Sequence, residues 1–189
     1  MTLCRSMRIS RPALLILFLL ISRCAVGQTF PDQGKDIHFP GINLGIGGGQ
    51  DYGGAGFRMT VVASQKVEFF GAAGLNLLGI GLNGGAGLRL RPKSSVCPYA
   101  GAMYGYNAII KISNQSDYNK TYYGPTFNLG SEFWIPKSTD FFNLEILVPV
   151  RSSKYSDDYD YLTKKLGYRL KKASPVVMSL GIHFTIRHS

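Results

Sequence analysis

The last part of the chain alternates between apolar and more polar residues with a period of two. Apolar side chains occupy every second position from Val176 to Ile186, and most positions between them are small or polar. Successive side chains of a β-strand point to opposite faces, so this alternation predicts a strand with one apolar face and one polar face.

Seven earlier segments show the same alternation and are separated by residues that favour turns. The predicted strands cover residues 41–48, 55–61, 67–77, 82–90, 100–110, 123–135 and 142–148. In the segment 100–110, aromatic and small residues fall on both faces, and we assign Tyr104, Tyr106 and Ile110 to the apolar face. With the C-terminal segment, the pattern predicts eight strands.

Charged residues avoid the apolar face of every predicted strand. They fall on the opposite face, at Arg58, Glu68, Arg89, Glu132 and Glu145. A lipid-facing Arg or Lys near the bilayer midplane costs about 2 to 4 kcal/mol, so a membrane enforces this partition, whereas a soluble barrel has an apolar interior. The sequence therefore predicts an all-β fold, an eight-stranded antiparallel up-and-down transmembrane β-barrel. Its lumen holds a charge network in which Arg58 and Arg89 pair with the glutamates.

The N-terminal residues are typical of a secretory signal. Arg5, Arg8 and Arg11 precede an apolar run that is too short to cross a bilayer as a helix, and the small residues Ala25-Val26-Gly27 suit signal peptidase. We expect a signal peptide over residues 1–27, an N-terminal segment over 28–40 and the barrel over 41–189. A lipoprotein signal that ends before Cys24 is an alternative, but Arg23 occupies a position where such signals usually have a small residue.

Cleavage after residue 27 changes the charge and the cysteine count. It leaves 17 basic and 11 acidic residues, so the formal charge falls from +10 to +6, and Cys97 remains as the single cysteine. The mature chain therefore has no internal disulfide and no cysteine metal site, and we expect no metal or other cofactor. The glycine-rich segments 45–49 and 81–87 lack the strand–loop–helix context of a nucleotide site, so we interpret them as inward glycines that relieve crowding.

The predicted connections differ in length at the two ends of the barrel. Those after the second, fourth and sixth strands are short, whereas residues 151–174 form a long outer connection. This connection combines tyrosines with five basic residues that are candidates for binding anionic sugars or lipopolysaccharide phosphates: Lys164, Lys165, Arg169, Lys171 and Lys172. A solvated loop, or an extended hairpin formed by its two halves, is an alternative.

The whole predicted barrel resembles the small eight-stranded outer-membrane barrels, OmpA- and OmpX-like, and the outer-membrane β-barrel domain proteins of Gram-negative Bacteroidetes. The resemblance is carried by residues 26–30, the glycine-alternating segments, Pro98-Tyr99-Ala100-Gly101 and the last strand with Phe184. It implies a location in the cell outer membrane. The partners it implies are membrane lipid, lipopolysaccharide and the barrel-assembly machinery, with no nucleic acid. Family barrels usually end on an aromatic residue, whereas this chain continues past Phe184.

Three classes of function are compatible with such a barrel. A closed, charge-paired lumen favours a structural or surface-interaction role through the outer loops, because eight strands leave room only for side chains. A narrow transporter for small solutes, or a lipid A-modifying enzyme, is the alternative. Ser179 and His183 are the one nucleophile and base that share a strand face, and both are predicted to face the lumen, so we expect no enzymatic activity.

Overall fold

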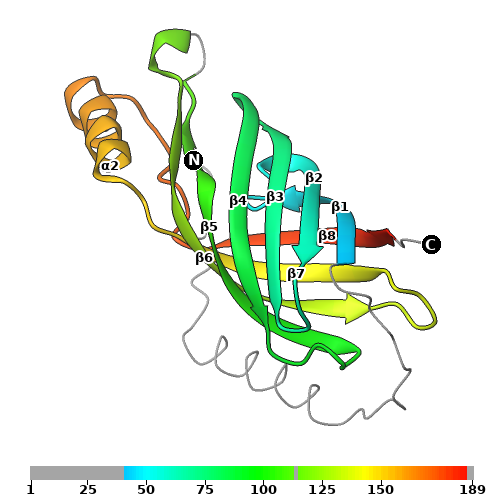
Figure 1. Ribbon diagram of the computed structural model, residues 1–189. Coiled ribbons are helices and arrows are strands. Elements are labelled where there is room, and N and C mark those ends of the chain that lie inside the picture. The colour runs from blue at the N-terminus through cyan, green and yellow to red at the C-terminus, as the bar shows by residue number, and fades with distance from the viewer. Residues whose placement is uncertain (1–40, 113–114, 187–189) are drawn as a thin grey trace, which may run out of the picture. The chain divides into compact units, whose positions relative to one another are not determined.

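The computed structural model describes residues 41–112 and 115–186, and these form a closed barrel of eight strands (Figure 1). Each strand pairs antiparallel with its neighbours in the chain, and β8 closes the barrel against β1. The strands are β1 (Gly41–Gly49), β2 (Gly54–Val62), β3 (Val67–Asn76), β4 (Gly79–Arg89), β5 (Val96–Ile110), β6 (Lys120–Trp134), β7 (Phe141–Pro149) and β8 (Val177–Ile186). The predicted all-β, eight-stranded antiparallel fold is confirmed. The predicted signal peptide and the segment 28–40 lie outside the described residues.

The two faces of the barrel wall have opposite chemistry. Large apolar side chains of every strand are exposed on the outer wall, and Phe57 and Leu75 are each more than two-thirds exposed. Six charged residues belong to strands, and five of them are buried inside. The sixth, Lys120, is the first residue of β6. No helix among the described residues is long and apolar enough to span a bilayer.

The predicted faces are confirmed for seven strands and corrected at the end of β5. Ile110 was expected on the outer wall, but it faces inward and is buried. The register between β5 and β6 shifts between Tyr106 and Ala108, where Asn107 is an extra residue. One extra residue in a strand reverses the faces of all residues beyond it, so Ala108 and Ile110 continue the inner face.

The connections give the barrel two different ends. At the turn end, β2–β3, β4–β5 and β6–β7 are joined by residues 63–66, 90–95 and 135–140, as predicted. At the loop end, β5 and β6 form a long hairpin that projects beyond the other strands and carries the short helix η1 (Ser116–Tyr118) (Figure 1). Between β3 and β4, only Leu77 and Leu78 form the turn, because β4 begins at Gly79 and not at Leu82 as expected.

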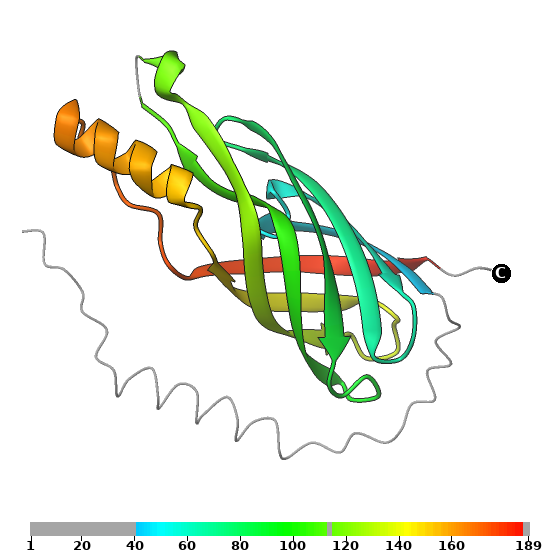
Figure 2. The ribbon, with the colours of Figure 1, turned by 60° about the vertical axis from the view of Figure 1, so that its left-hand side comes forward.

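The long connection between β7 and β8 is helical and is not the extended hairpin considered as an alternative. It contains α2 (Ser153–Asp160), which continues into the π-helix η2 (Tyr161–Lys165). Ser152 caps α2 by accepting a hydrogen bond from the Tyr155 backbone amide. Figures 1 and 2 both show α2 beside the projecting β5–β6 hairpin. There, Tyr155 and Leu162 pack on Ile110 and Tyr122. Tyr122 therefore lies inside a hydrophobic cluster between the helix and the hairpin.

Candidate functional site

A connected network of charged side chains fills the middle of the barrel. Arg58 contacts Glu145 at 2.5 Å and Glu68 at 3.4 Å. Arg89 contacts the other carboxylate oxygen of Glu68 at 3.1 Å and Glu132 at 2.7 Å. All five residues of the predicted lumen network are therefore brought together, and each is at most 3% exposed. Such burial is tolerated because each charge has an opposite partner.

Neutral side chains complete the coordination of this network. The two Glu145 oxygens accept hydrogen bonds from the Asn143 and Asn128 amides, each at 2.8 Å. The Arg58 guanidinium lies 3.8 Å from the centre of the Phe70 ring, a cation–π contact. These neutral contacts orient the buried charged groups, whose charges are balanced by the ion pairs.

The connection between β1 and β2 folds into the barrel, which the sequence did not indicate. We call residues 50–53 the inward turn. Asp51 and Tyr52 have no exposed surface, although the predicted strands 41–48 and 55–61 leave both in a connection between strands. Asp51 joins the network at 3.1 Å from Arg58 and also contacts Ser179. The network thus contains four carboxylates and two guanidiniums, a formal charge of −2.

Hydrogen bonds attach the inward turn to strands on all sides of the lumen. Gln50 donates to Thr126 of β6 at 3.0 Å, and the Asn83 amide of β4 donates to the backbone carbonyls of Gln50 and Asp51. The Tyr52 hydroxyl donates to Asn143 of β7 at 3.0 Å and lies 2.7 Å from His183 Nε2 of β8. The turn therefore joins strands that are not neighbours in the barrel wall.

Inward glycines provide the space that the inward turn occupies. A Cβ on Gly47 would lie 2.6 Å from the Tyr52 ring, and a Cβ on Gly81 would lie 2.5 Å from the Gly53 carbonyl oxygen. Gly74 and Gly181 also lie against Tyr52. The sequence predicted that these glycines relieve crowding in the lumen. The structure shows what would be crowded, namely the backbone of the inward turn and the Tyr52 ring.

Below the inward turn, packed side chains leave a small polar cavity. Its walls include Thr60, Glu68, Tyr99 and Glu132, and it is too narrow to admit a water molecule. His183, at the cavity wall, stacks on Phe141 with 4.6 Å between ring centres. The hydroxyl of Ser179 donates to the Gly48 carbonyl, whereas His183 contacts Tyr52, so each has partners of its own in the lumen.

At the loop end, the predicted anion-binding residues are all exposed. Lys164 is paired with Asp160 at 2.7 Å, and Lys165 lies 5.7 Å from the centre of the Tyr161 ring. Arg169, Lys171 and Lys172 belong to the segment that returns from η2 to β8. The Tyr159 hydroxyl donates to the Leu170 carbonyl, and the Ala173 amide donates to the Tyr155 hydroxyl, so this return segment is fixed against α2.

One acidic residue fastens the helix to the hairpin. Asp158 of α2 accepts hydrogen bonds from the Tyr122 hydroxyl at 2.8 Å and from Lys120 at 3.1 Å. Partial burial disfavours the ionised carboxylate, but these two donors outweigh that effect and lower the pKa of Asp158 below its ordinary value. Asp158 is therefore ionised and bonded wherever the pH exceeds that value.

No protein-family model matches this chain, and no curated protein matches it. The described residues also contain no group of three or more His, Cys, Asp or Glu side chains that could hold a metal ion.

Proposed function

We propose that the protein is an integral barrel of the bacterial outer membrane, with a structural or surface-interaction role through its loop end. The observation that carries the proposal is the outer wall. Exposed apolar side chains surround the barrel on all eight strands, and the described strands place no charged side chain on that wall between their ends.

An aqueous environment does not explain this wall. Soluble monomers rarely expose contiguous apolar patches larger than a few hundred Å². A barrel in water is also expected to keep its apolar residues inside, whereas this barrel encloses asparagines, arginines and carboxylates. A lipid bilayer accounts for both faces at once, because it favours apolar side chains outside and leaves the polar groups to satisfy one another inside.

The filled lumen favours this role over transport. The inward turn occupies the lumen near the loop end, and the charge network occupies it further down. Two levels of packed side chains thus separate the ends of the barrel. We infer that the mature protein begins at Gln28 after export and that its loop end faces the cell exterior. This orientation follows the rule that short turns lie on the periplasmic side.

Membrane integration can be tested with one arginine placed on the wall or beyond it. Ile146 lies near the middle of β7 and is 49% exposed, whereas Ser95 is exposed in the turn before β5. We expect the parent protein and Ser95→Arg to stay in the outer-membrane fraction after a urea wash. Ile146→Arg should lose about 2 to 4 kcal/mol of folding free energy in lipid vesicles.

Two results would contradict the proposal. One is recovery of the mature protein in the soluble periplasmic fraction after lysis without detergent. The other is equal folding of the Ile146 and Ser95 variants in vesicles, because a wall that does not contact lipid has no reason to exclude arginine.

A further inference from the structure

The Ser179 hydroxyl has two contacts and only one hydrogen. Its Oγ lies 3.1 Å from the Gly48 carbonyl oxygen and also contacts Oδ1 of Asp51. A carbonyl oxygen only accepts hydrogen bonds, and so does an ionised carboxylate, so the two groups would compete for that hydrogen. A protonated Asp51 would instead donate to Ser179 Oγ, while the serine donates to Gly48. Both contacts are then hydrogen bonds at the same time.

Asp51 also shares its cation with a second carboxylate. Oδ2 of Asp51 and Oε1 of Glu145 lie 3.1 Å and 2.5 Å from the same nitrogen, Nη1 of Arg58. Neither carboxyl group has exposed surface. Burial and a neighbouring like charge both favour the neutral form of an acid, and two carboxylates in one site do not both ionise readily. We therefore expect one proton on this pair.

The hydrogen bonds around the pair indicate that the proton is on Asp51 and not on Glu145. Besides the guanidinium, the Glu145 oxygens accept from the Asn128 and Asn143 amides, each at 2.8 Å. The Asn143 amide nitrogen is free to donate because the amide oxygen is the atom that accepts from the Tyr52 hydroxyl. All these contacts suit an ionised Glu145, whereas Asp51 has the one contact that suits an acid.

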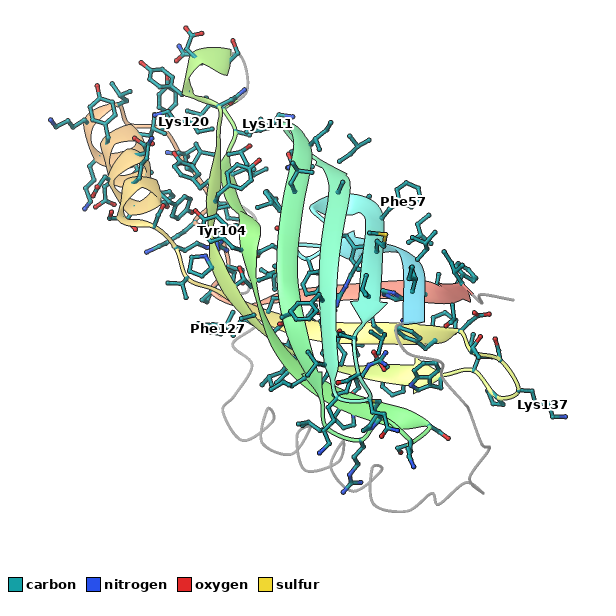
Figure 3. The ribbon with its side chains drawn as sticks, viewed as in Figure 1. Phe57, Tyr104, Lys111, Lys120, Phe127 and Lys137 are labelled. Atoms are coloured by element: carbon teal, nitrogen blue, oxygen red, sulfur yellow. The ribbon has the colours of Figure 1, made fainter. Side chains whose placement is uncertain are left out.

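The other charged and titratable side chains that line the lumen around this pair come from six strands: Arg58 of β2, Glu68 of β3, Arg89 of β4, Tyr99 of β5, Glu132 of β6 and His183 of β8. Arg58 points inward because Phe57, its neighbour in β2, lies on the outer wall (Figure 3). Among the described residues, Arg58 is the only cation paired with Asp51. A neutral Asp51 reduces the formal charge of the network from −2 to −1.

We propose that Asp51 is a neutral carboxylic acid in the folded barrel, donates to Ser179, and couples docking of the inward turn to the uptake of one proton. When this proton is lost, Asp51 repels Glu145 and competes with Gly48 for the serine hydroxyl, so docking of the turn is weakened. Closure of the lumen at the level of the inward turn therefore depends on pH. This inference goes beyond the proposed function and applies in detergent micelles as well as in a membrane.

The first test needs no substitution. The mature protein is folded in uncharged detergent micelles with every aspartate labelled by a heavy carbon isotope at the carboxyl group, and infrared spectra are recorded at neutral pH. We expect one isotope-shifted carbonyl band of a protonated acid, because exposed aspartates are ionised at this pH. Absence of such a band would overturn the proposal.

The second test measures how protons and folding are linked. Asp51→Asn replaces the acid with a neutral group of the same shape that also donates to Ser179, and Asp157→Asn, at an exposed position of α2, is the matched control. Urea unfolding is measured from about pH 5 to pH 9. The folded parent holds a proton that the unfolded chain has lost. Its unfolding constant should therefore rise relative to that of Asp51→Asn by about tenfold per pH unit until the folded acid ionises. Asp157→Asn should follow the parent.

A constant ratio between the parent and Asp51→Asn would overturn the proposal, because Asp51 would then be ionised in both states. Glu145→Gln should unfold more readily than the parent at every pH, and a tenfold change per pH unit in this variant instead would assign the proton to Glu145 and overturn the proposal.

Docking itself is followed by amide hydrogen exchange in residues 50–53. Protection should decrease above neutral pH in the parent and persist in Asp51→Asn, and equal behaviour of the two proteins would overturn the coupling. Failure of the Ile146→Arg experiment would refute the membrane location and leave these results unchanged.

Discussion

At the scale of single residues, glycines on the inner face of the barrel leave space that another part of the chain fills. Gly47 and Gly48 are neighbours in β1, but only Gly47 faces the lumen. A Cβ on Gly47 would overlap the Tyr52 ring, whereas a Cβ on Gly48 would have no atom within 4 Å. Two adjacent glycines therefore carry different constraints.

We expect Gly47→Ala to destabilise the barrel by about 1 to 3 kcal/mol, because the Tyr52 ring of the inward turn and the Leu180 carbonyl of β8 must shift to accept the methyl group. Gly48→Ala is the control and should change the free energy of unfolding by less than about 0.5 kcal/mol. Urea unfolding in lipid vesicles measures both. Equal effects of the two substitutions would show that the inward turn does not need the space at Gly47.

The buried ion pairs give a second prediction at this scale. Glu132→Ala leaves Arg89 with Glu68 as its remaining carboxylate and should cost about 3 to 5 kcal/mol. Combining Arg89→Met with Glu132→Leu removes both charges and should cost less than the sum of Arg89→Met alone and Glu132→Leu alone. Unfolding of the four proteins of this cycle measures the coupling, and additive effects would show that the pair does not interact.

At the scale of elements, the wall of the barrel is predictable from the sequence, and its departures from regularity are not. Alternation identifies seven strand faces because each side of the wall has uniform chemistry. The inner position of Ile110 depends on a bulge, which a pattern with fixed period does not contain. The α2 helix left a signal in Ser152 and in the spacing of Tyr155, Tyr159 and Leu162, which suits a helix better than a hairpin.

In the lumen, too, some features are predictable from the sequence and others are not. The inward positions of Arg58, Glu68, Arg89, Glu132 and Glu145 follow from strand alternation, so the sequence predicts the network. The inward turn does not follow, because its partners Thr126 and His183 are 76 and 131 residues distant along the chain. Only the register of all strands brings them together.

The attachment of α2 gives a prediction about acid. The folded pKa of Asp158 is lowered, so its contribution to docking is complete above the ordinary pKa of an aspartate. The contribution is lost as the pH falls through the lower folded value. We expect amide hydrogen-exchange protection in α2 to decrease in this acidic range. Asp158→Asn should show weak protection at every pH, and Asp157→Asn should behave like the parent. Unchanged protection in Asp158→Asn would show that packing alone holds the helix.

At the scale of the whole molecule, the lumen is closed at two levels, and each has its own chemistry. We expect no steady conductance in planar bilayers from the parent protein. Tyr52→Ala should also be silent, because the network of Arg58, Arg89 and their carboxylates remains packed below the inward turn. Steady conductance of the parent would contradict the closed lumen. Conductance of the Tyr52 variant alone would show that the inward turn is the sole barrier.

The inward turn also has a consequence for the order of folding. Its hydrogen bonds reach β4, β6, β7 and β8 from the first hairpin of the chain. Contacts between residues so distant in sequence form after the entropy of closing the intervening loops has been lost. The turn can therefore complete its hydrogen bonds only when the last strand has arrived, so we expect it to act mainly on the kinetics of the finished barrel. Weakening it accelerates unfolding and leaves the rate of strand assembly nearly unchanged, as for any contact absent from the transition state.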